Sequence, residues 1–271
     1  MMRSSRWVLA LAGLLTALIW PPAADAQMAD RCLALAQAPA PVQRAAFRPV
    51  ALGPAEVRLI FIGHATWLIE SPNGVTAATD YNDYIRPPLV PDIATMNRAH
   101  TTHYSLFPDP AIKHVLRGWN PEGGPAVHDI TLGDMRVRNV ATNIRDWGGG
   151  GYMAYGNSIF IFEVAGMCIG HLGHLHHTLT EQQVAHIGQL DVVMVAVDGS
   201  YTMDVDGVVE TLKTLRARLI LPMHYFNPST LNRFLERIGG HFPVERSDEQ
   251  AIVVSQPTLP AAPKVLVLPG N

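Results

Sequence analysis

The strongest constraint on the fold is the segment Asp191-Val-Val-Met-Val-Ala-Val197, which is apolar throughout after its first residue. A strand that alternates apolar and polar residues has one face in water, whereas a strand without alternation is buried on both faces. Strands of the second kind occur mainly in parallel sheets that are covered on both sides. This segment therefore predicts a layered α/β domain, with the strand in the interior of a sheet.

Strand and helix patterns alternate along the second half of the chain, around this segment. Strand patterns occupy 167–172 and 218–223, and helix patterns occupy 180–187, 204–216 and 229–238. The helix starts are marked by a capping box, Thr180-Glu-Gln-Gln183, and by the N-cap residues Asp204 and Ser229. This alternation predicts a βαβ layer.

The first half has a different rhythm, with short strand patterns joined by turns. These patterns lie at 57–62, 66–70, 75–79, 130–141 and 158–164. The first three are nearly consecutive and predict an antiparallel meander. Residues 83–124 are interpreted as proline-rich loops, and the glycine run 148–151 as a flexible lid or a hairpin. A meander half joined to a βαβ half predicts an α/β fold with two sheets between helices, an αββα sandwich.

The N-terminal residues 1–26 have the organisation of a secretory signal. Arginines precede an apolar run, 7–20, and a small-x-small cleavage site follows at 24–26. A membrane anchor needs about 20 apolar residues, and Pro21 ends this run too early. We therefore predict export to the periplasm or the medium, with no membrane span after cleavage. Residues 27–55 form an Ala/Pro-rich lead-in, and 56–271 form the single folded domain.

The two cysteines, Cys32 and Cys168, leave two interpretations open. In an oxidising compartment they can form a disulfide. Cys168 lies in an apolar strand pattern, however, and a buried free thiol is the interpretation we favour slightly.

Composition restricts the function classes. The formal charge is only −3, which gives no electrostatic footprint for nucleic acid, so we expect a small-molecule substrate. Charged residues make up 16% of the chain, and against this sparse background there are 12 histidines. Neutral imidazole is the commonest protein ligand for zinc, so this imbalance is a first indication of metal chemistry.

The histidines gather at the predicted ends of strands. The densest group is His171-Leu-Gly-His-Leu-His-His177, and further histidines follow strand patterns at His64, His100, His103 and His224. Ligands of α/β sheets bind outside the carboxyl ends of the strands, so these side chains are expected to meet in one cleft. Alternate residues of an extended chain share a face, so the four histidines of 171–177 cannot all bind one ion.

Several segments together resemble the ascorbate-phosphate-lactonase-like branch of the metallo-β-lactamase superfamily. They are Gly63-His-Ala-Thr-Trp-Leu-Ile-Glu70, Thr79-Asp80, His171-Leu-Gly-His-Leu-His-His-Thr-Leu-Thr180, Val197-Asp-Gly-Ser-Tyr-Thr-Met-Asp204 and Ile220-Leu-Pro-Met-His-Tyr225. The resemblance extends from about residue 57 to 226 and implies an αββα sandwich and hydrolase activity that depends on zinc.

The first metal motif departs from the family pattern. The superfamily carries His-x-His-x-Asp-His, whereas this chain has Thr101-Thr-His-Tyr-Ser-Leu106 and keeps only His103. His100 lies one residue before the first expected ligand and is a candidate substitute. The next family histidine falls near Asn143-Ile-Arg-Asp146, where Arg145 or Asp146 now stands.

The later motifs show one further change. The aspartate that bridges two ions in relatives corresponds to His174, whereas the final histidine is kept as His224. Two dications need an anionic bridge to offset their repulsion, and an imidazole does not supply one. We therefore expect one zinc ion rather than two, held by His103, His174 and His224 with His100 as an additional candidate; the alternative is that these are relic positions.

Four more residues are candidates for roles at the cleft. His64 can reach a metal or hydrogen-bond within the cleft floor. Asp80 can orient a ligand histidine or cap a turn. Asp198, where relatives have glycine, can supply a carboxylate or form a tight turn, and Tyr201 can line the cleft or pack in the core.

Two classes of function follow. The first is a metal-dependent hydrolase that acts on a lactone, an ester or a phosphoester. The alternative is a protein of the same fold that has lost catalysis and binds a small ligand or a metal ion, with the histidine-rich segment 171–177 as a site of metal capture.

Overall fold

The apolar segment 191–197 contains strand β10 (Val192–Ala196), and all residues of this strand are buried. The structure is a computed structural model that describes residues 51–146, 148 and 150–270. β10 pairs in parallel with β9 (Met167–His171) on one side and β11 (Leu219–Met223) on the other. The predicted interior, parallel strand is therefore confirmed.

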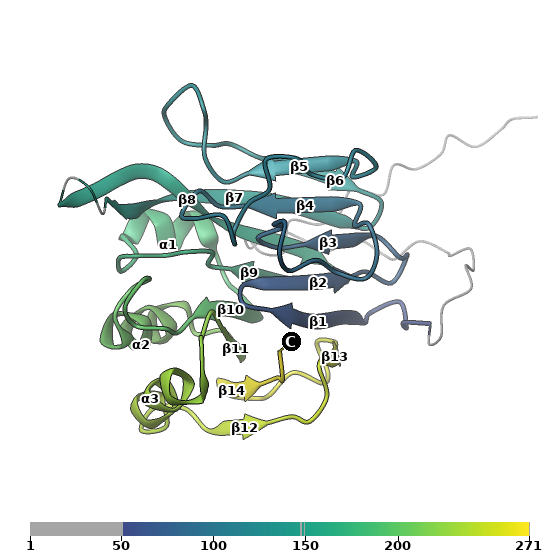
Figure 1. Cartoon of the computed structure of the whole chain (residues 1–271). Coiled ribbons are helices and arrows are strands. Elements are labelled where there is room, and N and C mark those ends of the chain that lie inside the picture. The colour runs from purple at the N-terminus through teal and green to yellow at the C-terminus, as the bar shows by residue number, and fades with distance from the viewer. Residues whose placement is uncertain (1–50, 147, 149, 271) are drawn as a thin grey trace, which may run out of the picture.

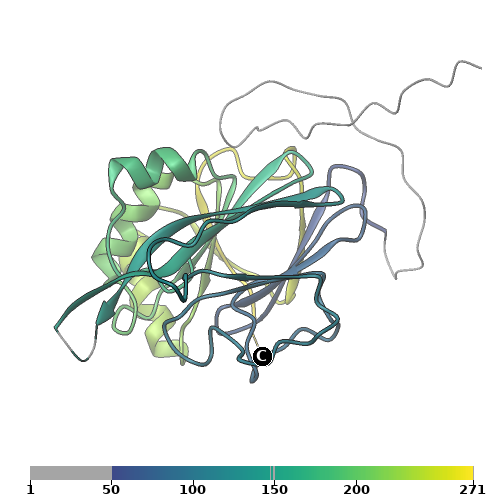
Figure 2. The ribbon, with the colours of Figure 1, turned by 90° about the horizontal axis from the view of Figure 1, so that it is seen from above.

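β10 belongs to the larger of two sheets, which face each other in Figure 2. This sheet has eight strands in the order β12 (Val244–Arg246), β14 (Lys264–Val267), β11, β10, β9, β8 (Gly151–Val164), β7 (Met135–Asp146) and β6 (Asp129–Leu132). The second sheet has six strands in the order β13 (Ala251–Val254), β1 (Val57–Gly63), β2 (Thr66–Glu70), β3 (Thr76–Ala78), β4 (Ile93–Met96) and β5 (His114–Arg117).

The helices cover the outer face of the eight-stranded sheet (Figure 2). They are α1 (Glu181–Ile187), α2 (Val205–Leu215) and α3 (Pro228–Ile238). Over the outer face of the six-stranded sheet, the described residues place loops rather than helices, with Tyr81 and Ile112 packed on Ala94 and Met96. The fold is an α/β sandwich, as the sequence predicts, with its helical layer on one side.

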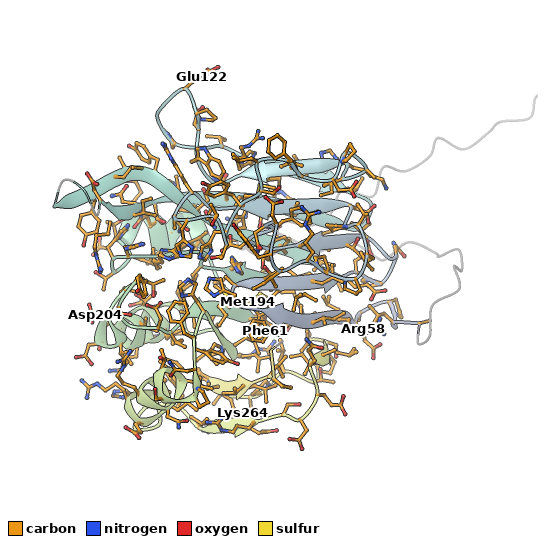
Figure 3. All side chains as sticks on the ribbon, viewed as in Figure 1. Arg58, Phe61, Glu122, Met194, Asp204 and Lys264 are labelled. Atoms are coloured by element: carbon orange, nitrogen blue, oxygen red, sulfur yellow. The ribbon has the colours of Figure 1, made fainter. Side chains whose placement is uncertain are left out.

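The main core lies between the two sheets. Phe61 and Trp67 from the smaller sheet stack with ring centroids 4.6 Å apart and share one cluster with Phe162 and Met194 from the larger sheet. Figure 3 shows Phe61 and Met194 in the interior, whereas Glu122 lies at the tip of an outer loop. Burial of these large apolar side chains holds the sheets together and fixes the strand ends on which the site is built.

The helix boundaries test the capping predictions. The hydroxyl of Thr180 accepts from the backbone of Gln183 and completes the capping box of α1, and Asp204 caps α2, both as predicted. The prediction of Ser229 as the cap of α3 is wrong, because the cap is Asn227, whose side chain accepts from Thr230 N. Ser229 instead donates its hydroxyl to Asn227 Oδ1 over 2.6 Å.

The glycine run lies in a long hairpin, β7–β8, which projects from one side in Figure 1. Asp146 pairs with Gly151, so of the two interpretations of this run the hairpin is confirmed. The strand pattern 130–141 is divided between β6 and β7 by a turn at Gly133, and β4 and β5 lie in the region interpreted as loops.

Three predictions concern the N-terminal segment and the cysteines. The signal at 1–26 and most of the lead-in at 27–55 lie outside the described residues. Cys168 is disulfide-bonded, so its interpretation as a free thiol is wrong; Cys32 lies outside the described residues. Across the part of the chain that is described, no helix has the length and apolarity to cross a membrane.

Candidate metal centre

Histidines from both sheets meet at one edge of the sandwich. His64 follows β1, His100 and His103 lie in the loop after β4, His174 follows β9, and His224 follows β11. The backbone N–H of His224 donates to the carbonyl oxygen of His64 over 2.6 Å and ties the two sheets together at this point. Strand pairing thus brings together side chains that are far apart in the sequence.

Four of these rings, His100, His103, His174 and His224, lie against one another. The Nε2 atoms of His103 and His224 are 3.1 Å apart, and the Nε2 atoms of His100 and His174 are also 3.1 Å apart. The ring centroid of His174 lies 4.7–4.9 Å from those of the other three. Two nitrogens bound at the usual length to one tetrahedral zinc ion are about 3.4 Å apart. Each of these two pairs therefore has a spacing close to that of two ligands on a single ion.

His64 lies beside this group. Its ring centroid is 4.1 Å from that of His224, and its Nε2 is 3.0 Å from the hydroxyl of Thr102. The same hydroxyl is 2.8 Å from Nδ1 of His100, so Thr102 orients both rings. His64, His100, His103 and His224 offer nitrogens that all lie within 4.8 Å of one another. His174 is not part of this set and joins it through the contact of its Nε2 with that of His100.

Two buried carboxylates hold the outer nitrogens of the ligand candidates. Asp80 Oδ2 is 2.6 Å from His103 Nδ1, and Asp198 Oδ1 is 3.1 Å from His224 Nδ1. An imidazole that donates its Nδ1–H to a carboxylate presents an unprotonated Nε2, and histidine ligands of metal ions are commonly held in this way. Asp80 and Asp198 thus face the backs of the ligand candidates rather than the point between them.

The backbone at the site is strained. His64, Asp80 and His224 have φ angles of 52°, 40° and 57°, and they are three of the six non-glycine residues with positive φ in the described chain. A non-glycine residue in this region costs about 1–3 kcal/mol, and such residues cluster at functional sites. Packing and hydrogen bonds of the sandwich hold these residues in the conformations that direct their side chains inward.

Sequence reasoning missed the amides that support the loops of the site. Asn97 donates to Asp80 Oδ1 over 2.9 Å, and Asn157 accepts from the backbone N–H of His174 over 2.7 Å. A Cβ at Gly173 would come within 2.4 Å of both amides, so only glycine fits there. The glycine before His174 was the available signal, because its φ of 60° marks a turn that glycine adopts readily.

Tyr201 and Arg145 lie farther out than the ligand candidates. Tyr201 is half exposed, and its ring contacts that of Phe226, with 5.5 Å between the centroids. Arg145 donates to the carbonyl oxygens of Ser200 and Thr202 over 2.9 and 3.3 Å and so supports the loop that carries Asp198. Tyr201 is therefore placed at the rim of the site, against Phe226.

The positions that hold a second ion in relatives offer no ligand here. Ser105 donates its hydroxyl to Asp83 over 2.6 Å, and the side chain of Leu106 is exposed. His177 accepts from the backbone of Asn143 and does not join the cluster, and His171 contacts the carbonyl oxygen of Ala65. The described residues therefore provide one group of imidazoles with the spacing of a metal site.

Burial favours the neutral imidazole at His64, His103 and His174. It is the main reason that the pKa of His64 falls to about 3, with the neighbouring imidazoles lowering this pKa further. Burial likewise lowers the pKa of His103 and of His174 well below the usual value. Only a neutral imidazole has a lone pair to offer a metal ion, so the cluster is ready to bind a cation at neutral pH.

The pKa values of the two carboxylates, Asp80 and Asp198, are shifted in opposite directions. Burial raises the pKa of Asp80 to about 6 despite opposing contributions, among them His171 and the hydrogen bond from Asn97. Burial acts in the same direction on Asp198, but hydrogen bonds from His224 and from the loop hold the pKa of Asp198 well below its usual range. Asp198 is therefore the permanent anion behind the cluster.

We expect the metal-free protein to lose stability as the pH falls from 7 to 5. The pKa values of at least four cluster histidines are lowered in the folded state, so below about 6.5 the unfolded chain binds more protons. Asp80 acts in the opposite direction between pH 4 and 6, but it is a single group. Each group contributes at most about 1.4 kcal/mol per pH unit. The check is the thermal midpoint of chelator-treated protein at pH 7, 6 and 5; an equal or higher midpoint at pH 5 would contradict this expectation.

Known proteins resemble this chain over most of its described domain. A family model described as a β-lactamase superfamily domain matches residues 58–224. A UPF0173 metal-dependent hydrolase of Thermoplasma volcanium is 33% identical over 196 residues, which cover 63% of this chain and 84% of the relative. A corresponding protein of Thermoplasma acidophilum is 23% identical over 193 residues, or 62% and 83% of the two chains.

Solved structures show the same architecture. A protein of Thermotoga maritima, described as a Zn-dependent hydrolase of the metallo-β-lactamase superfamily, superposes with a TM-score of 0.59 and 26% identity, over 79% of this chain and all of that one. A metallo hydrolase of Ignicoccus hospitalis superposes with a TM-score of 0.51 and 18% identity, over 68% and 91% of the two chains, and shows the fold alone. This chain belongs to the metallo-β-lactamase superfamily.

Proposed function

We propose that this protein is a metal-dependent hydrolase with a single ion held by histidine side chains. The observation that carries the proposal is the group His100, His103, His174 and His224, in which two Nε2 pairs are each separated by 3.1 Å. The Thermoplasma relative, a metal-dependent hydrolase by name, supports the same class.

The donor set fits zinc. Imidazole nitrogen suits zinc among the common divalent ions, and three or four imidazoles are a sufficient set. Bound there, a zinc ion supplies Lewis acidity and activates water near neutral pH. The chain's own contribution is to hold the ligand nitrogens: Asp80 and Asp198 fix the outer nitrogens of His103 and His224, and Thr102 orients His100.

A single ion is the stoichiometry that the electrostatics favours. Two dications in one site repel each other and need an anionic ligand between them, whereas His174 is neutral. Ser105 and Leu106 are turned away from the cluster. The carboxylates of Asp80 and Asp198 are engaged behind the imidazoles and supply no bridge.

The proposed substrate is a small lactone, ester or phosphoester. A cavity of about 490 Å³ adjoins His64, and its lining includes Phe61, Phe226, Leu231 and Arg246. This volume is within the range of about 300–1,000 Å³ that is usual for small-molecule sites. Apolar side chains together with the charged residues Arg246 and Asp248 in the lining suit a substrate that has both an apolar and a polar part.

Export completes the proposal. Residues 1–26 have the organisation of a secretory signal, and the disulfide at Cys168 supports an oxidising compartment such as a periplasm.

The function is tested with the purified full chain, stripped by a chelator and reloaded with zinc, manganese or iron(II). We expect turnover of at least one member of a panel of lactone, aryl ester and phosphodiester substrates, with loss of turnover on chelation and recovery on reloading. Metal binding without turnover of any member would favour the alternative, a non-catalytic binding protein. The observation that favours this second candidate is that Ser105 and Leu106 stand at the positions where the family motif has a ligand aspartate and a ligand histidine.

A further inference from the structure

His174 is in close contact with a second buried histidine that no ligand role explains. Nδ1 of His174 lies 2.6 Å from Nε2 of His176. Both side chains are buried, with exposed fractions of 1% and 4%. The opposite nitrogen of His174, Nε2, is the atom that faces His100.

The contact between these two nitrogens determines which nitrogen of His174 carries a proton. If His174 donates its Nδ1–H to Nε2 of His176, the Nε2 of His174 is unprotonated and has a free lone pair. If His176 donates instead, the Nε2 of His174 carries the proton and cannot bind a metal ion. The state of His176 therefore decides whether His174 is a ligand.

We propose that His176 is a positioning residue that accepts the Nδ1–H of His174 and so makes His174 the fourth imidazole ligand of the metal centre. In this role His176 does for His174 what Asp80 does for His103 and Asp198 does for His224. The inference rests on the proposed metal site, and it adds a residue that does not itself reach the ion.

The far nitrogen of His176 makes no competing contact. Its Nδ1 is buried and has no hydrogen-bond partner among the described residues. With His176 as the acceptor, this Nδ1 carries the remaining proton, and a buried unpaired donor costs free energy. The contact with His174 is thus the one hydrogen bond that this buried imidazole makes among the described residues, and a metal ion on Nε2 of His174 would select the direction in which His176 accepts.

A pair of substitutions separates the two nitrogens of His176. The carbonyl oxygen of a glutamine side chain reaches about as far as Nε2, whereas an asparagine side chain reaches only as far as Nδ1. His176→Gln therefore keeps an acceptor for His174, and His176→Asn removes it. The same two substitutions at His177, which contacts Asn143 and Thr178 instead of the cluster, are the matched controls.

The measurement is the zinc affinity of the folded full chain by competition with a chromogenic chelator, together with the visible spectrum of the Co²⁺-loaded protein. We expect His176→Asn to weaken zinc binding by about 10–100-fold and to change the Co²⁺ spectrum, because supporting hydrogen bonds have effects of this size. His176→Gln and both His177 variants are expected to stay within about threefold of the parent.

Each outcome decides one of the two proposals. Equal zinc affinity and an unchanged Co²⁺ spectrum in His176→Asn would overturn the role of His176 and leave the metal hydrolase intact. Weak binding in both His176 variants would also overturn it, since that would indicate a general packing effect. The expected pattern without turnover of any substrate would support His176 and count against the hydrolase. A parent protein that binds neither Zn²⁺ nor Co²⁺ would refute both.

Discussion

His224→Ala is expected to release the metal ion, with a loss of metal affinity of more than about 100-fold and a corresponding loss of hydrolysis. His224 is fully buried, its Nε2 is 3.1 Å from that of His103, and its Nδ1 faces Asp198. Its removal takes away one ligand and leaves the carboxylate of Asp198 without its imidazole partner. The measurement is the metal content after dialysis, together with turnover of the substrate identified in the panel.

His186→Ala is the matched control for this experiment. His186 is an exposed histidine in the last turn of α1, away from the cluster, so its replacement is expected to change neither metal content nor turnover. Full metal content in His224→Ala would show that the cluster does not hold the ion and would contradict the assignment of the site.

Phe162→Ala is expected to destabilise the protein by about 3–5 kcal/mol, because it opens a cavity in a closely packed core. Phe162 lies on β8 in the cluster between the two sheets and has no exposed surface. The same loss is expected in the metal-free protein, because Phe162 packs in the core between the two sheets and is not one of the cluster histidines. The measurement is the free energy of unfolding from denaturant titration.

Val253→Ala is the corresponding surface control. Val253 lies on the edge strand β13 and is 44% exposed, so its truncation is expected to change the free energy of unfolding by less than about 0.5–1 kcal/mol. A loss below about 1 kcal/mol in Phe162→Ala would show that the two sheets are not packed as described.

The fold could be predicted where local chemistry decides the structure. The apolar segment at β10 and the capping box of α1 are local signals, and both are confirmed. The short strands β4 and β5 carry no such signal, because β4 forms by pairing with β3, and β5 by pairing with β4, across a loop-rich region. The cap of α3 was assigned to Ser229 because Asn227 and Ser229 are both cap residues, and only the backbone conformation distinguishes them.

For the site, the ligand candidates could be predicted from the sequence, whereas the contacts that support them could not. Histidines at strand ends and the resemblance to known motifs singled out His103, His174 and His224 as ligand candidates, and the structure brings their rings together. The contacts behind the ligands join residues that are far apart in the sequence, as with His224 and Asp198, or depend on the shape of one turn, as with His174 and His176. Such contacts depend on the conformation of loops. Loops have no repeating pattern of apolar residues from which their conformation could be predicted.

Binding of a single metal ion by imidazoles is tested through the metal stoichiometry of the purified full chain. After incubation with zinc, manganese and iron(II) and removal of the excess, elemental analysis is expected to find close to one ion per chain, and His174→Ala is expected to reduce this value. Two ions per chain, or none with any of the three metals, would contradict the account.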